Sequence, residues 1–395
     1  METRNHSTLK QGTVWIMAIA CGGTVANIYY NQPLLAQMGQ NFHVSSGQMG
    51  LIPTLTQIGV ALGMFLFVPL GDMLERRRLI VTMLGVTACA LVGAAVSPSF
   101  GLLAVASLAI GVTSIEPHLI VPFAANLAGQ KQRGQVVGSV MSGLLIGILL
   151  ARTVSGFVGA TLGWRAMYWI ASGLMVGLAI VLGKFLPLNH PLSTMSYWQL
   201  LRSLPGLIRE QPVLRESALF GAMLFGAFSA FWTTLVFLLA VPPYHYGSEV
   251  AGLFGLVGVV GASAAPLTGR LADRKSPRLT VFLGIAITMS SFVVFWLFGE
   301  QLLGLIVGVI LLDLGVQSGH VSNQARIYNL SPEVHSRLNT VYMVSYFLGG
   351  ALGSSLGAYG WSVWQWNGVC LVGLSMLTVA FAAYFRGRKA QWGGS

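Results

Sequence analysis

The chain has 395 residues, of which 54% are apolar and only 8% are charged. Soluble domains carry about 25% charged residues, so this composition excludes an ordinary soluble protein and predicts one that crosses a membrane many times. The formal net charge is +11, but the basic residues stand in loops between apolar stretches, a distribution that argues against a nucleic-acid-binding surface.

Twelve apolar stretches are long enough to cross a bilayer, which takes about 20 helical residues. They are Val14–Ala36, Gly47–Leu70, Leu79–Val96, Leu102–Leu127, Val136–Leu162, Ala166–Leu186, Ala218–Ala240, Val250–Gly269, Leu279–Phe298, Leu302–Leu330, Leu338–Ala358 and Val363–Tyr384. The sequence therefore predicts an all-α membrane protein of twelve transmembrane helices, with a six-helix half at 1–186, a linker at 187–216 and a second six-helix half at 217–395.

The basic residues predict the orientation in the membrane. The N-terminus, the even-numbered loops, the linker and the C-terminal tail hold 20 of the 22 Lys and Arg residues. Because basic loops stay in the cytoplasm, we expect both termini and the linker on the cytoplasmic side of the cell (inner) membrane. We expect a monomer in the lipid bilayer, with no nucleic acid as a partner.

The linker contains an amphipathic stretch. Tyr197 to Arg202 and Leu207 to Arg209 alternate apolar, aromatic and basic residues. This pattern favours an interfacial helix that joins the two halves, and a disordered linker is the alternative.

A charged loop occurs twice, once in each half. The first, Pro69–Arg78, contains Asp72, and the second, Gly269–Arg278, contains Asp273, which follows 201 positions later (273 − 72). A repeat of half the chain length between apolar helices is typical of a duplicated transporter.

These features resemble the major facilitator superfamily over essentially the whole chain. The loop signature of that family is Gly-x-x-x-Asp-Arg-x-Gly-Arg-Arg. Asp72, Arg76 and Arg77 match it in the first loop, and Gly269, Asp273 and Arg274 match it in the second. Departures from the signature stand at Val68, Met73, Glu75, Ser276 and Pro277. The resemblance implies that Asp72, Arg76, Arg77, Asp273 and Arg274 form a conformational latch; the alternative is that these charges only fix the topology.

The fifth span resembles the glycine signature of drug/proton antiporters. Gly134, Gly143 and Gly147 fit its spacing, whereas Ile148 replaces its proline and Ala151-Arg152 replaces its final glycine pair. The segment from Ala26 to Leu35 is similar to a subgroup of drug and metabolite efflux carriers. The resemblance therefore implies efflux but names no substrate.

Three ionisable residues, Glu116, Arg152 and Asp313, lie deep within predicted spans. Such groups are costly in a bilayer and usually line a cavity or a proton path, although a structural ion pair is the alternative. Counting residues inward from the outer ends of the spans predicts that Arg152 pairs with Asp313 across the halves, with Glu116 as the other candidate partner. We expect these three residues to couple protons to transport.

Polar and aromatic residues in four spans predict a substrate cavity. In the tenth span, Asp313, Gln317, His320 and Gln324 share one helical face, because they follow the i, i+4, i+7, i+11 pattern. Packing between helices is the alternative. In the first span Asn27, Tyr30 and Asn31 are expected on one helical face, and Pro33 is expected to kink the helix. The full set of expected cavity residues is Asn27, Tyr30, Asn31, Trp232, Gln317, His320, Gln324, Tyr342 and Tyr346.

The sequence thus favours a secondary transporter that moves a small amphipathic organic molecule by alternating access, as proton-coupled efflux. An importer or an uncoupled facilitator of the same fold is the alternative. We expect no enzymatic activity, because the chain has neither a nucleophile motif nor a metal-binding cluster. It also lacks a phosphate-binding loop, so we expect a proton gradient instead of ATP, and no metal or other cofactor.

Overall fold

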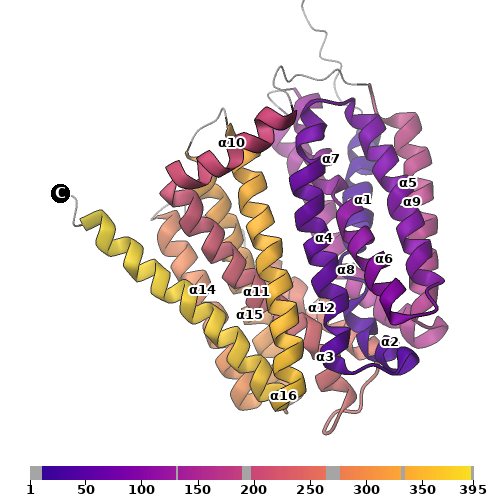
Figure 1. Ribbon diagram of the computed structural model, residues 1–395, viewed down its shortest axis with the longest axis vertical. Helices are drawn as coiled ribbons and strands as arrows, with labels where there is room; N and C mark the ends of the chain where they lie inside the picture. Colours follow the sequence, from indigo (N-terminus) through magenta and orange to yellow (C-terminus); the bar gives the residue numbers. More distant parts are fainter. Residues whose placement is uncertain (1–10, 130–131, 189–196, 264–275, 331–333, 393–395) are drawn as a thin grey trace, which may run out of the picture.

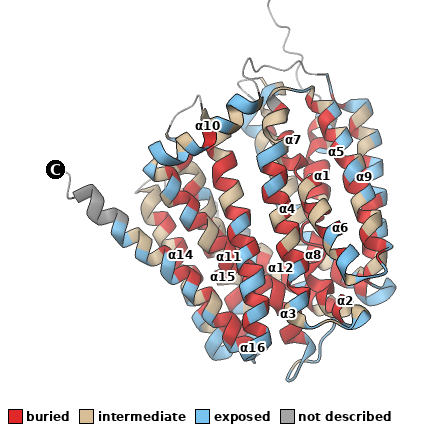
Figure 2. Cartoon of the chain, in the orientation of Figure 1, coloured by how far each residue is buried: buried red, intermediate tan, exposed pale blue. Residues whose placement is uncertain are grey.

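The computed structural model describes residues 11–129, 132–188, 197–263, 276–330 and 334–392, which form helices and turns. Two groups of helices lie side by side, and a shorter helix crosses one end (Figure 1). Figure 2 shows buried residues inside both groups and exposed residues along their outward faces.

The first group comprises α1 to α9 and two short 3-10 helices. Their bounds are α1 Gln11–Ala26, η1 Gln32–Leu34, α2 Leu35–Phe42, α3 Ser46–Met49, α4 Leu51–Phe67, η2 Pro69–Asp72, α5 Arg76–Ala95, α6 Phe100–Thr113, α7 Glu116–Leu127, α8 Arg133–Leu162 and α9 Trp164–Phe185. Within this group α1 packs on α8, α4 on α6, and α5 on α9.

The second group follows α10, Tyr197–Glu210. It comprises α11 Pro212–Ala240, α12 Ser248–Ser263, α14 Pro277–Phe298, α15 Leu302–Tyr328 and α16 His335–Trp392. Helix α16 is two helices joined at a kink, because Trp364 and Gln365 have non-helical backbone angles. Helix α11 packs along α16, and α14 packs along α15.

These helices match the twelve predicted spans. Within the described residues nine helices are long and apolar enough to cross a membrane, counting α6 and α7 together and α16 once. The kink in α16 makes it two passes, and α1 and α12 are shorter apolar helices. The fold class predicted from the sequence is confirmed.

The first predicted span is broken where the sequence predicted only a kink. Helix α1 ends at Ala26, a turn follows in which the Tyr30 N–H donates to the Ala26 carbonyl at 3.1 Å, and η1 begins at Gln32. Pro33 lies in η1 and has no N–H to continue a helical ladder. The break carries polar side chains into the middle of the bundle.

Glycines bring α1 and α8 into backbone contact. A Cβ atom on Gly22 or Gly143 would lie within 3.0 Å of the other helix's backbone, and so would one on Gly147. A Cβ atom on Gly134 would meet nothing within 4 Å. Two of the three signature glycines therefore serve close helix packing, as small residues do in membrane helices.

The two groups are joined at the end of the molecule where α2 lies, here named the α2 end, opposite the α10 end (Figure 1). Helix α8 packs on α12, and α4 packs on α16. Across these contacts Gln37 donates to the Ser248 hydroxyl at 3.0 Å, and Thr153 donates to the Gly252 carbonyl at 2.9 Å. These contacts hold the two groups together near the α2 end.

Candidate functional site

The Arg152 guanidinium lies between the two groups of helices and is only 1% exposed. Its Nε donates to the Gln32 side-chain oxygen at 2.7 Å, and its Nη2 is buried without a hydrogen-bond partner. Its Cζ lies 4.0 Å from the ring centre of Trp232, 4.8 Å from that of Tyr29 and 5.5 Å from that of Phe228. Cation–π attraction to these rings therefore replaces part of the stabilisation that hydration would give the charge.

Asp313 lies on α15 and packs against α12. It is 2% exposed, and its Oδ2 is buried without a partner. A Cβ atom on Gly258 would come within 3.1 Å of that oxygen, so the carboxylate rests against the backbone of α12. Glycine at this position gives the carboxylate its space.

The predicted ion pair between Arg152 and Asp313 is not formed. These two described residues have no nitrogen–oxygen contact within 4.0 Å, although their charges are close enough to interact electrostatically. Helix α12 separates them: Gly255 faces the Arg152 side chain, and Gly258, one turn later, faces Asp313. Counting residues inward from the ends of the spans gave the wrong partner for Arg152. Its guanidinium is instead held by Gln32, which lies in a break that the sequence did not predict.

Glu116 begins α7 directly after a break between α6 and α7. It is fully buried, its Oε1 accepts from the Thr87 hydroxyl at 3.2 Å, and its Oε2 has no partner. A carboxylate in the first turn of a helix is favoured by the helix dipole. The structure therefore holds two buried carboxylates, one in each group of helices, and neither is in an ion pair with a described residue.

The structure brings three predicted cavity residues together. His320 Nδ1 lies 3.0 Å from the Tyr342 hydroxyl, and the His320 ring centre is 4.7 Å from that of Tyr346. Tyr346 stacks on Phe225 at 4.0 Å. This cluster lies on α11, α15 and α16, in the second group of helices.

Asn27 and Asn31 are not brought together. The Asn27 amide donates to Met175 Sδ at 3.3 Å in α9, and the Asn31 amide donates to the Thr56 hydroxyl at 3.2 Å in α4. The prediction that they share a helical face is wrong, because α1 ends at Ala26. Tyr30 is buried, whereas Gln317 and Gln324 are half-buried.

Sequence reasoning missed a polar network across the interface. Gln57 of α4 donates to the Ser354 hydroxyl of α16 at 3.0 Å and accepts from Ser229 of α11 at 3.4 Å. Thr233 donates to Ser354 at 2.9 Å. Single polar residues in apolar spans were the available signal, but no helical spacing links residues on three different helices.

Among the residues that the structure describes, two cavities lie along the interface toward the α2 end. A space of about 10 Å³ lies beside Arg152, Gln32 and Trp232. Nearer the α2 end, a cleft of about 290 Å³ is lined by apolar residues that include Leu35, Phe237 and Trp361. Apolar clefts with few polar groups suit small organic ligands.

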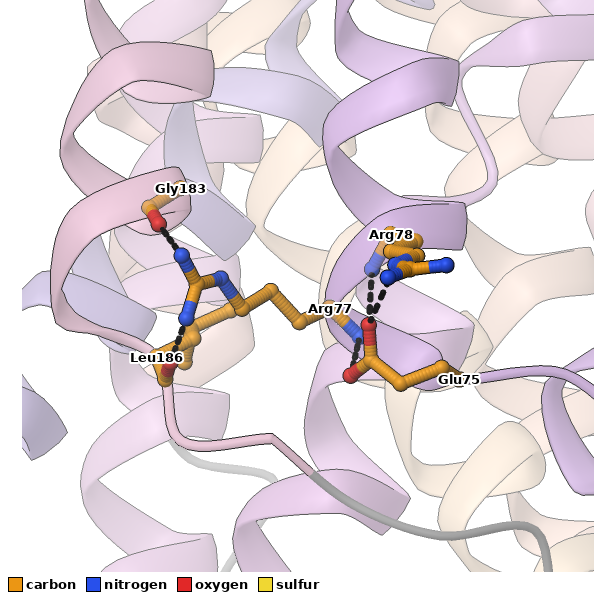
Figure 3. A network of polar contacts seen from close by, with 5 residues as sticks. All are labelled: Glu75, Arg77, Arg78, Gly183 and Leu186. Atoms are coloured by element: carbon orange, nitrogen blue, oxygen red, sulfur yellow. Dashed lines mark hydrogen bonds and ion pairs between the residues drawn. The ribbon is translucent and has the colours of Figure 1, made fainter.

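The first charged loop binds the end of α9 (Figure 3). Glu75 accepts hydrogen bonds from the backbone N–H groups of Arg77 and Arg78 at 3.0 and 2.9 Å and so caps α5. The Arg77 guanidinium donates to the carbonyls of Leu186, at 3.1 Å, and Gly183.

Arg76 donates from Nε to the Gly71 carbonyl at 2.8 Å. The side chain of Asp72, and the whole of Asp273 and Arg274, lie outside what the structure describes. Their predicted role in a latch stays a prediction.

The second loop contributes Arg278, which donates to the Tyr384 carbonyl at 3.1 Å. It also forms an ion pair with Glu216 at 2.8 Å, and Glu216 forms a second ion pair with Arg326. These contacts tie the α10 ends of α11, α14, α15 and α16 together.

The chain resembles known transporters along its length. The family model of the Major Facilitator Superfamily matches residues 15–354. The "Uncharacterized transporter YgaY" of Escherichia coli O157:H7 is 41% identical over 98% of this chain and 99% of its own. A "Probable sugar efflux transporter" of Helicobacter pylori is 23% identical over 82% of each chain.

Among solved structures, a bacterial homologue of the human lysosomal transporter Spinster, inward-facing and unoccupied, aligns with a TM-score of 0.73. It is 14% identical and the alignment covers 97% of both chains, so this likeness concerns the fold. With the helix arrangement, the duplicated loops and the family match in agreement, the chain belongs to the Major Facilitator Superfamily and is a membrane transporter.

Proposed function

We propose that the protein exports a small amphipathic organic molecule in exchange for protons. The observation that carries this proposal is the pair of buried carboxylates Asp313 and Glu116, each with an oxygen that has no partner. An ionised carboxylate is costly at such a site, so uptake of a proton stabilises the buried state. Ionisable residues within membrane spans usually serve ion movement.

Asp313 and Arg152 offer a way to couple the proton to movement. They lie on α15 and α8, in opposite groups of helices, and their charges interact. Protonation of Asp313 removes that attraction across the interface. It therefore shifts the equilibrium between arrangements of the two groups, as alternating access requires.

Two features support an amphipathic substrate. The cleft of about 290 Å³ between the groups is mainly apolar, and the deeper space near Arg152 is lined by Gln32 and Trp232. Such a path suits an apolar body with a few hydrogen-bonding groups. The glycine spacing in α8 and the name of the Helicobacter pylori relative support efflux.

The test uses inside-out membrane vesicles that are acidified inside and contain a pH-sensitive dye. Compounds are added from a panel of amphipathic organic molecules and of sugars, since sugars are named for that relative. An exchanger releases protons when a substrate arrives, so a substrate raises the internal pH. Vesicles without the protein are the control.

The alternative is an importer or an uncoupled facilitator. A compound that crosses the membrane through the protein with no proton release, at any pH gradient, would identify a facilitator. If protons and the compound instead move together through the protein, from its periplasmic side to its cytoplasmic side, the protein is an importer.

A further inference from the structure

Helix α10 presents an exposed aromatic and basic stripe. Trp198, Arg202, Pro205 and Arg209 are all exposed, Trp198 by 67%. Their i, i+4, i+7, i+11 spacing places them on one face of the helix. Within the described part of the chain, the guanidinium groups of Arg202 and Arg209 have no ion-pair or hydrogen-bond partner.

The opposite face of α10 fastens it to both groups of helices. The Tyr197 hydroxyl donates to the Leu66 carbonyl, in the last turn of α4, at 2.9 Å. Arg337, in the first turn of α16, donates to the Ser203 hydroxyl at 3.1 Å. Leu204 is buried beneath the helix.

These contacts set the level of α10 in the membrane. Helix α4 ends at Phe67 and α16 begins at His335, so α10 lies where membrane-spanning helices end (Figure 1). That level corresponds to the interface between the hydrocarbon core and the headgroups. An exposed tryptophan at this depth is typical of side chains that contact the interface.

We infer that Trp198, Arg202 and Arg209 bind the headgroups of anionic phospholipids in the leaflet at the α10 end. Charge complementarity carries the assignment: two unpaired guanidinium groups, two turns apart, match the phosphates of neighbouring lipids. Trp198 sits one turn from Arg202 and inserts among the glycerol groups. Arg215 is not part of the site, because its guanidinium donates to the carbonyls of Ile208 and Arg209.

This contact would anchor the helix that bridges the two groups. Because α10 is bonded to α4 and to α16, lipids that hold it in place would act on both sides of the moving interface. Each basic side chain near an anionic surface contributes about a 5.4-fold gain in affinity, so the pair supplies about 30-fold.

The experiment measures the fluorescence of Trp198 in reconstituted full-length protein. Wild type and Trp198→Phe are compared in phosphatidylcholine vesicles that contain brominated phosphatidylglycerol or brominated phosphatidylcholine as a contact quencher. We expect stronger quenching of the Trp198 signal by the anionic lipid. Raising the salt concentration to about 1 M, where the screening length is about 3 Å, should remove that preference.

Arg202→Gln with Arg209→Gln should weaken the preference for phosphatidylglycerol about 30-fold, whereas lysine at both positions should retain it. Arg78→Gln is the matched control, because the Arg78 side chain is 87% exposed at the same end of the molecule. Equal quenching by both lipids would overturn the assignment. An absence of quenching by either lipid would also overturn it, and would mean that the stripe faces water and suits a soluble partner.

Discussion

Arg77 and Arg278 make the same contact in the two groups of helices. Arg77 donates to the Gly183 carbonyl at the end of α9, and Arg278 donates to the Tyr384 carbonyl near the end of α16. The donors are 201 positions apart (278 − 77), and so are the acceptors (384 − 183). Arg77 places a positive charge at the C-terminus of α9, where free carbonyls and the helix dipole favour it. The Tyr384 carbonyl lies eight residues before the end of α16 at Trp392 (392 − 384), so Arg278 binds it within the helix.

Arg77→Gln should lower the apparent melting temperature of the purified protein. The substitution removes hydrogen bonds from a charged donor to the carbonyls of Gly183 and Leu186, and we expect a loss of about 1–3 kcal/mol. Arg78→Gln is the control, because substitution of that exposed side chain should change the free energy of unfolding by less than about 0.5 kcal/mol. Equal melting temperatures for the two variants would contradict the capping role.

Arg278→Gln should lower the melting temperature more than Arg77→Gln does. It removes the bond to Tyr384 and also leaves Glu216 with Arg326 as its remaining ion-pair partner. Breaking a half-buried charge pair is costly because the remaining charge loses part of its compensation. The same melting measurement tests this order, and a smaller effect for Arg278→Gln would contradict it.

Gly147→Ala should destabilise the protein by about 1–3 kcal/mol or more. The added Cβ would meet the backbone of Gly22, which cannot move without separating α1 from α8. Gly138→Ala is the matched control on the same helix, since a Cβ there meets nothing within 4 Å. Thermal unfolding that affects both variants equally would show that the close approach does not hold these helices together.

The orientation in the membrane is tested with single cysteines in a variant without Cys21, Cys89 and Cys370. Cysteines at Gln40 and Pro243, which are exposed at the α2 end, should react with an impermeant thiol reagent added to intact cells. A cysteine at Gln132, exposed at the α10 end, should react only after the cells are opened. The reverse pattern would invert the predicted topology.

The loops show what the sequence could predict and what it could not. The charge pattern around Arg77 and Arg278 located both loops and the duplication, because charges and apolar runs follow directly from the bilayer. Their acceptors at Gly183 and Tyr384 could not be predicted, since a backbone carbonyl carries no sequence signal. A helix in the linker was likewise predicted from the amphipathic pattern, and α10 lies there; its place at the membrane interface stays a prediction.

The site was predicted less well than the fold. Asn27 and Asn31 were placed by helical spacing, and that failed because the chain leaves the helix at Ala26. Gln32 was overlooked although it binds Arg152. Both errors come from the same broken stretch, whose turn is held by backbone hydrogen bonds and by tertiary packing that periodicity does not reveal.

The central claim is that Asp313 couples proton movement to export of the substrate. Comparing proton release in inside-out vesicles between wild type and Asp313→Asn tests it most directly. Asparagine keeps the shape of the side chain and cannot take up a proton. Glu300→Gln, which neutralises an exposed acid outside the helices, is the matched control. We predict that a compound which releases protons through the wild type does so equally through Glu300→Gln and fails to do so through Asp313→Asn. Full, pH-dependent proton release through Asp313→Asn at equal protein abundance would contradict the claim.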